Sequence, residues 1–117
     1  HIGLRIDEIT PGRAVFSIEV AEMHMNGAGA VHGGVHATLM DSAMAVALIS
    51  EGLRVATTHL DINYVEPMTH GRITCTGQII HRGRRTAIAE ARVRDEAGRL
   101  LAFGTGTFLI LEQQLEL

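Results

Sequence analysis

Residues 35–50 read VHATLMDSAMAVALIS, and this stretch decides the fold. Almost all of its residues are apolar, small or hydroxylic, and Asp41 is the only charged one. Such a run predicts a helix that is buried on most of its faces rather than an amphipathic surface helix. An ionised carboxylate inside it costs several kcal/mol of desolvation unless a partner or a reaction uses the charge. Asp41 is therefore the first candidate for a catalytic group.

Strand-like alternation surrounds this helix on both sides. The segments expected to form strands are 2–10, 14–20, 54–66, 72–81, 86–94 and 100–111. Within 54–66, strict alternation places Leu60, Ile62 and Tyr64 on one face and Thr57 on the other. The links 67–71, 82–85 and 95–98 are short, so we expect consecutive strands to be antiparallel neighbours.

The order of these elements predicts the fold class. One helix cannot cover both faces of a flat sheet, whereas a strongly curved antiparallel sheet can wrap around it. The sequence therefore predicts an α+β fold of the hotdog type, with residues 1–117 as one domain. The alternative is a sandwich with one stray helix, which explains the apolar character of this helix less well.

The composition limits the classes of partner and the compartment. The 117 residues carry a net charge of −3, which gives no reason to expect a nucleic-acid surface. Cys75 is the only cysteine, so an internal disulfide is excluded and a reducing, cytoplasmic setting fits. The apolar helix is short and contains His36 and Asp41, so we expect no membrane span.

A pair of glycines opens the helix. The free backbone N–H groups at this positive end, beside Gly33 and Gly34, favour an anion or a polarised carbonyl oxygen. Gly34 and Asp41 share one face of the helix but lie about 10 Å apart along its axis. One carbonyl cannot reach both, because each contact must be about 3 Å long. If both act on one substrate, one of them comes from a second copy of the chain, as a two-fold pairing of antiparallel helices would allow.

The glycine pair and the acid belong to a longer motif. Residues 26–34 read NGAGAVHGG and residues 38–41 read TLMD, so that Asp41 follows the first glycine of His-Gly-Gly by eight positions. Together with 61–67 (DINYVEP) and 83–86 (GRRT), this motif resembles the phenylacetic-acid-degradation-type (PaaI-type) hotdog thioesterases over nearly the whole chain. The resemblance implies hydrolysis of acyl-coenzyme A thioesters.

The resemblance also implies a role for each residue of the motif. The Gly33 N–H would donate to the thioester carbonyl, and Asp41 of a second subunit would act as general base or as nucleophile. Asn26 would hold the carbonyl or the attacking water, and His32 would order the turn and assist the departing thiolate. Thr57 matches a position where relatives carry a hydroxyl that positions water. The enzyme would be a dimer or a dimer of dimers without a cofactor, since coenzyme A is part of the substrate.

A basic turn is expected between two of the later strands. It consists of residues 82–85 (RGRR). The simplest interpretation is a basic loop exposed to solvent, but the phosphates of coenzyme A need cations at the mouth of a pocket. The resemblance implies that this turn and the end of the preceding strand border the nucleotide. The resulting candidates for substrate binding are Gly34, Tyr64, Pro67, Arg82, Gly83, Arg84, Arg85 and Thr86.

The sequence also contains features that bear on other sites and functions. His32 and His36 have the i, i+4 spacing of a helical metal site, but no HExxH motif or further ligand accompanies them, so no metal is expected. A non-catalytic acyl-CoA sensor of the same fold is an alternative, although loss of the helix acid would favour it. A hotdog hydratase or dehydratase is another, although its motif differs from the one found here.

Overall fold

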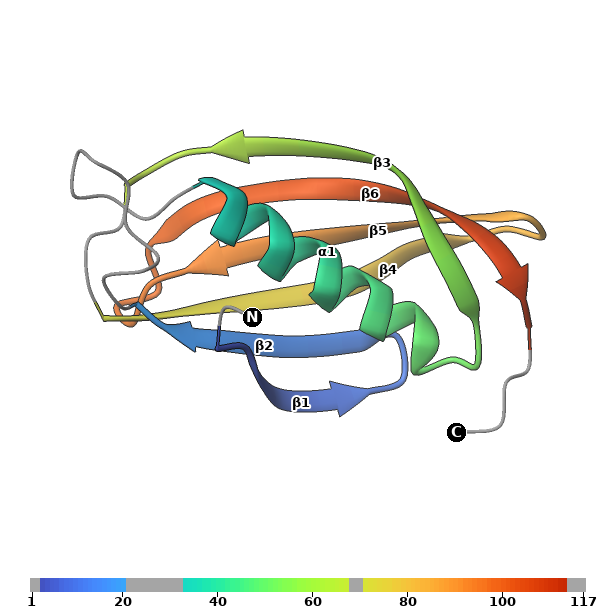
Figure 1. The fold of residues 1–117 in the computed structure, drawn as a ribbon, viewed down its shortest axis with the longest axis horizontal. Coiled ribbons are helices and arrows are strands. Elements are labelled where there is room, and N and C mark those ends of the chain that lie inside the picture. The colour runs from blue at the N-terminus through green and yellow to red at the C-terminus, as the bar shows by residue number, and fades with distance from the viewer. Residues whose placement is uncertain (1–2, 21–32, 68–70, 114–117) are drawn as a thin grey trace.

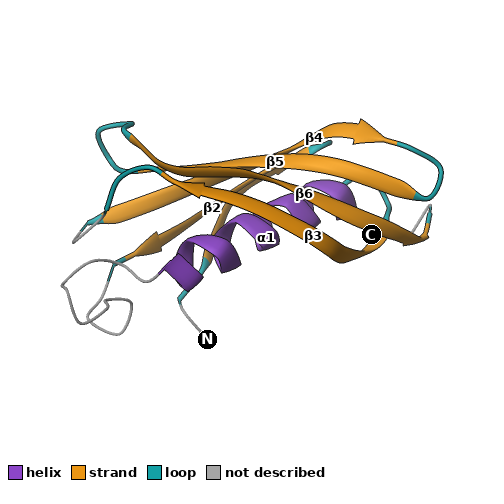
Figure 2. Cartoon of the chain, turned by 90° about the horizontal axis from the view of Figure 1, so that it is seen from above, coloured by secondary structure: helices purple, strands orange, loops and turns teal. Residues whose placement is uncertain are grey.

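Among the residues that the structure describes, one long helix lies against one face of a six-stranded antiparallel sheet (Figure 1). The computed structural model describes residues 3–20, 33–67 and 71–113. The sheet bends over the helix (Figure 2), so the predicted hotdog architecture is confirmed. The elements are, in chain order, β1 (Arg5–Thr10), β2 (Arg13–Glu19), α1 (Gly33–Ile49), β3 (Arg54–Tyr64), β4 (Arg72–Arg82), β5 (Thr86–Arg94) and β6 (Leu100–Glu112).

A row of small residues lets the helix lie close to the sheet. Ala14, Gly77, Ala91 and Gly104 pair side by side across β2, β4, β5 and β6. A Cβ atom added to Gly77 would lie 2.5 Å from the backbone of Ala43 in α1, so this approach requires glycine. The largest apolar side chains of the core are Ile18, Leu39, Met40, Met44, Leu48, Leu53, Ile73, Leu101 and Phe108.

Within one chain, helix α1 is enclosed on one side only. Its buried residues are Val35, His36, Leu39, Met40, Ala43, Met44, Ala47 and Leu48. The opposite face contains Gly34 and Thr38, which are exposed, and Ser42 and Ala45, which are half-buried. The prediction of burial on most faces is thus corrected for the isolated chain. The described residues include no helix with the length and apolarity that crossing a bilayer requires.

The order of the strands is β1-β2-β4-β5-β6-β3, which corrects one predicted pairing. Strands β1–β2, β4–β5 and β5–β6 are antiparallel neighbours as expected, but β3 pairs with β6 at an edge of the sheet and not with β4. The link 65–71 has seven residues, which can reach about 23 Å when extended. Passing β6 and β5 requires only about 14 Å. A short link therefore does not force two strands to pair.

A β-bulge in β3 decides which of its residues face the helix. Thr57 and His59 pair with consecutive residues of β6, so Thr58 is an extra residue in the strand. Strict alternation predicted Thr57 and Tyr64 on opposite faces of the sheet, and this prediction is wrong. The hydroxyl groups of both side chains reach helix α1, because the inserted residue reverses the alternation between them.

Candidate active site

Asp41 lies at the middle of helix α1, beside the edge strand β3. The hydroxyl of Thr57 donates a hydrogen bond of 2.7 Å to Asp41 Oδ1. The carboxylate is half-buried, and it forms none of the ion pairs found within the described residues. A carboxylate that is held by a hydroxyl and not neutralised by a cation can act as a base or as a nucleophile.

The glycine pair forms the first turn of α1. The carbonyl oxygen of Gly33 accepts a hydrogen bond of 2.9 Å from the Tyr64 hydroxyl, and that of Gly34 accepts one of 2.8 Å from the Thr38 hydroxyl. The N–H groups of a first helical turn have no carbonyl partner within the helix. This end of the helix, with its positive partial charge, can therefore polarise a carbonyl oxygen.

The spacing between the two groups agrees with the sequence argument. Both Gly34 and Asp41 lie within the continuous helix Gly33–Ile49, about 10 Å apart along its axis. One thioester carbonyl cannot contact both groups of the same chain. The structure thus holds an acid and a set of amide donors, but not as one complete site.

The basic turn between β4 and β5 lies beyond the other end of the helix. Arg82 forms an ion pair of 3.3 Å with Glu51, which follows the last turn of α1. The carbonyl groups of Arg84 and Arg85 accept hydrogen bonds from the C-terminal part of β6 and the residue after it. Both arginines are exposed, and neither forms an ion pair within the described residues.

Gly83 and Thr86 shape this turn. The Gly83 N–H donates to the Thr86 carbonyl at 2.8 Å, and a Cβ atom on Gly83 would lie 2.9 Å from the same oxygen. A side chain at position 83 would therefore open the turn. The Thr86 hydroxyl is exposed together with the neighbouring arginines, as a phosphate-binding group would have to be.

The predicted substrate-binding residues fall into two groups that one chain keeps apart. Tyr64 contacts the start of α1, and Pro67 follows it on the surface, whereas Arg82 contacts the residue beyond the helix end. A helix of 17 residues is about 25 Å long, and Figure 1 shows the end of β3 and the β4–β5 turn at opposite ends of the sheet. The two groups therefore do not form one compact site within a single chain.

Two predicted catalytic residues, Asn26 and His32, lie outside the described residues. A metal site was not expected, and no cluster of three or more His, Cys, Asp and Glu side chains occurs in the described part of the chain.

The sequence did not single out His36 as a functional residue. Its ring is buried and stacks against the ring of Tyr64, with centroids 5.9 Å apart and planes inclined by 29°. Neither ring nitrogen has a hydrogen-bond partner among the residues described. Burial lowers the pKa of the imidazole, because desolvation disfavours the charged ring. The only sequence signal for a role of His36 is its position as a histidine within the apolar run 35–50.

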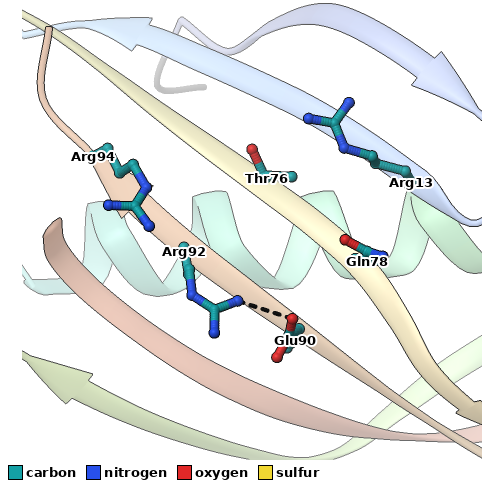
Figure 3. A pocket seen from close by; sticks show the side chains of 6 residues that line it. All are labelled: Arg13, Thr76, Gln78, Glu90, Arg92 and Arg94. Carbon is teal, nitrogen blue, oxygen red and sulfur yellow. Dashed lines mark hydrogen bonds and ion pairs between the residues drawn. The ribbon is translucent and has the colours of Figure 1, made fainter. Parts of the chain in front are cut away.

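The outer face of the sheet, away from the helix, contains a polar pocket of about 220 Å³ (Figure 3). It is lined by Arg13, Thr76, Gln78, Glu90, Arg92 and Arg94. Arg92 is paired with Glu90, Arg13 with Glu8, and Arg94 with a backbone carbonyl. None of the predicted site residues lies in this pocket, and each of its four charged side chains already has a partner.

Comparison with known proteins identifies relatives over most of the chain. The model of the thioesterase superfamily matches residues 28–102. Human acyl-coenzyme A thioesterase 13 is 32% identical over 101 residues, which cover 83% of this chain and 72% of the human protein.

Solved structures show the same fold. The PaaI protein of the Escherichia coli phenylacetic acid degradation operon has a TM-score of 0.92 at 26% identity, covering 98% of this chain and 84% of that one. A hypothetical thioesterase from Streptococcus pneumoniae, solved with coenzyme A, has a TM-score of 0.92 at 27% identity, covering 97% and 89%. The pneumococcal protein has also been solved as two alanine variants, at an aspartate and at a threonine that are sixteen positions apart.

Proposed function

This chain belongs to the thioesterase superfamily, and we propose that it hydrolyses acyl-coenzyme A thioesters at a site shared by two subunits. Its relatives include proteins named acyl-coenzyme A thioesterase. The single observation that carries the proposal is the Asp41 carboxylate. It lies in the apolar helix, held by Thr57 and free of an ion pair among the described residues.

The proposed chemistry uses Asp41 against a carbonyl polarised by the glycine turn. As a general base, Asp41 takes a proton from water while the water oxygen bonds to the carbonyl carbon; collapse of the tetrahedral intermediate then breaks the C–S bond. As a nucleophile, it displaces the coenzyme A thiolate, and water hydrolyses the resulting mixed anhydride. In both routes the N–H of Gly33 donates to the developing oxyanion. Asn26 orients the carbonyl or the water, and His32 supports the turn and the departing thiolate.

Thr57 supports this assignment of Asp41. Its hydroxyl holds one carboxylate oxygen, which leaves the other free to face water or substrate. The two residues are sixteen positions apart, which is the spacing of the aspartate and the threonine replaced in the pneumococcal relative. Thr57 therefore orients the carboxylate and contributes to positioning the water.

The shared site follows from the distance along α1 and from two uncovered surfaces. Strand β3 is eleven residues long, lies at the edge of the sheet and is mostly exposed. A long open edge of this kind readily pairs with another chain. The small-residue face of α1 that includes Gly34 and Ser42 is also open beside it. A two-fold partner on these surfaces would bring its glycine turn to Asp41, in a dimer or a dimer of dimers.

The proposed coenzyme A contacts span the same subunit boundary. Arg84 and Arg85 offer guanidinium groups without acidic partners among the described residues, whereas Glu51 partly neutralises Arg82. Phosphate groups bind strongly to such free guanidinium groups. The turn of Gly83 and Thr86 presents them, while the Tyr64–Pro67 segment of the other subunit borders the ligand. No cofactor is part of this proposal, and a cytoplasmic location suits the buried free thiol of Cys75.

The test is thiol release from a panel of coenzyme A thioesters with short, medium and aryl-acetyl groups. Asp41→Asn keeps the size of the side chain and removes its charge, so we expect turnover to fall at least about a hundredfold. Asp61→Asn, an exposed aspartate on the other face of β3, is the matched control. Wild-type turnover in Asp41→Asn, or no hydrolysis of any thioester by the wild type, would reject the proposal.

Sharing between subunits has its own test. Gly33→Pro removes the proposed donor N–H at a helix position where proline is tolerated. A mixed dimer of this variant and Asp41→Asn keeps one complete site of two, so isolated mixed dimers should recover about half of the wild-type turnover. Isolated mixed dimers that stay inactive would contradict the shared site.

A further inference from the structure

Tyr64 joins the end of β3 to the first turn of α1. Its hydroxyl donates to the Gly33 carbonyl at 2.9 Å, across 31 positions of sequence. A Cβ atom on Gly33 would lie 3.2 Å from both the Cζ and the hydroxyl oxygen of Tyr64. The ring edge thus lies directly against the glycine, and any larger residue at position 33 would push it away.

The bond to the Gly33 carbonyl restrains the amide groups of the turn. A carbonyl and the following N–H belong to one planar trans peptide and point in opposite directions. Fixing the Gly33 oxygen therefore fixes the direction of the Gly34 N–H, and it also restrains the Cα atom that carries the Gly33 N–H. Glycine adopts many backbone conformations, so a turn made of two glycines has most to gain from such an anchor.

The other hydroxyl bond at the turn is of a different kind. Thr38 donates to the Gly34 carbonyl four positions earlier, which threonine often does within a helix. That bond connects the helix to itself and cannot place the turn relative to the sheet. Tyr64 belongs to a strand, so its bond sets the position of the turn within the fold.

His36 provides the surface on which the Tyr64 ring rests. Positions 33 and 36 are neighbours on one face of the helix, so the glycine and the imidazole together form the contact for the phenol ring. The imidazole is only 3% exposed, its pKa is lowered by burial, and its centroid lies 5.9 Å from that of Tyr64. Tyr64 itself is 56% exposed, which leaves the rest of its surface open to a ligand.

We propose that Tyr64 is a positioning residue that holds the Gly33–Gly34 peptide, and with it the carbonyl-polarising N–H groups, in place relative to β3, with His36 as the packing surface. This inference rests on the proposed function and goes beyond the expectation that Tyr64 borders the nucleotide. Removing a complete oxyanion donor costs about 10²–10³ in kcat. Loosening a donor that is still present costs less, and we expect a loss of about tenfold.

The kinetic test uses Tyr64→Phe, which keeps the ring and its packing but removes the hydroxyl. We expect kcat to fall about tenfold on a coenzyme A ester and equally on a truncated pantetheine ester, with KM changed less than about twofold. Ser50→Ala is the matched control, because Ser50 also donates to a helix carbonyl but at the far end of α1. Unchanged kcat, or a KM increase confined to the coenzyme A ester, would overturn the proposal.

A double-mutant comparison tests the direct contact. Gly33→Ala should displace the Tyr64 ring, so its effect on kcat and that of Tyr64→Phe should combine to less than their product. Effects that multiply fully would show that the two residues act separately.

Amide hydrogen exchange supplies a readout that does not depend on activity. The amides of residues 37 and 38 bond back to the carbonyls of Gly33 and Gly34 in the helix. Tyr64→Phe should speed exchange at these two amides about tenfold relative to the wild type, with residues 45–49 unchanged. Equal exchange rates at the first turn would reject the positioning role even if no thioester were hydrolysed. If Tyr64→Phe exchanges faster at this turn but the wild-type protein hydrolyses no thioester, only the proposed function is rejected.

Discussion

Replacing Thr57 by valine should lower kcat about tenfold without unfolding the protein. The Thr57 hydroxyl donates to Asp41 Oδ1 at 2.7 Å, and a hydrogen bond to a charged group contributes about 1.5–3 kcal/mol. Asp41 is half-buried, so water replaces part of the lost bond and the lower end of this range applies. About 1.4 kcal/mol corresponds to a tenfold change in rate. Valine has nearly the shape of threonine, so the packing of β3 should change little.

The assay is release of free thiol at saturating acyl-coenzyme A. Thr57→Ser retains a hydroxyl and should remain within about threefold of the wild type. Thr58→Val is the matched control, because Thr58 is the adjacent bulge residue and its hydroxyl donates to the Thr107 carbonyl at 3.1 Å, away from the carboxylate. Wild-type kcat in Thr57→Val would refute the reasoning. So would a Thr57→Ser variant as impaired as Thr57→Val, since the methyl group would then matter rather than the hydroxyl.

Three further predictions concern buried and charged groups. Burial raises the pKa of the Cys75 thiol to about 12, so iodoacetamide at pH 8 should modify the folded protein about a hundredfold more slowly than the urea-unfolded protein; equal rates would contradict the buried position. Burial lowers the pKa of His36, so its contribution to stability is present above the unfolded-state pKa of about 6.5 and is lost as the pH falls below it toward the folded-state pKa. In His36→Leu, the urea midpoint should therefore fall less between pH 7 and pH 5 than in the wild type. An equal fall in both proteins would show that His36 does not cause the pH dependence. Arg84→Ala should raise KM for coenzyme A esters more than for a pantetheine ester, and Arg82→Ala should have a smaller effect because Glu51 already pairs with it; equal effects on both esters would argue against phosphate contact.

The helix and most strand boundaries could be predicted because they depend on local pattern. The run 35–50 has no polar face, and the structure places the helix at Gly33–Ile49. The pairing of β3 with β6 could not be predicted in this way. It depends on how the whole sheet closes around the helix, and the link 65–71 is long enough for either arrangement.

The candidate site was predictable only in part. Asp41 stands out because a single charge in an apolar helix requires an explanation. The direction of Thr57 was predicted wrongly because a bulge is set by the pairing of two strands, and neither glycine nor proline marks Thr58 in the sequence. The contact between Tyr64 and Gly33 joins positions 31 apart, and a glycine that leaves room for an aromatic ring gives no local signal.

Strand β3 connects the two halves of the proposed site. Thr57 fixes the carboxylate at the middle of α1, and Tyr64 fixes the amides at its start. In a two-fold pair, that carboxylate and those amides serve different sites, so each β3 contributes to both. The outward side chains of β3, such as Asp61 and Asn63, contact neither group. Substitutions on the outer face that disturb the strand should therefore affect both sites together, whereas loss of one inward hydroxyl removes one component from each.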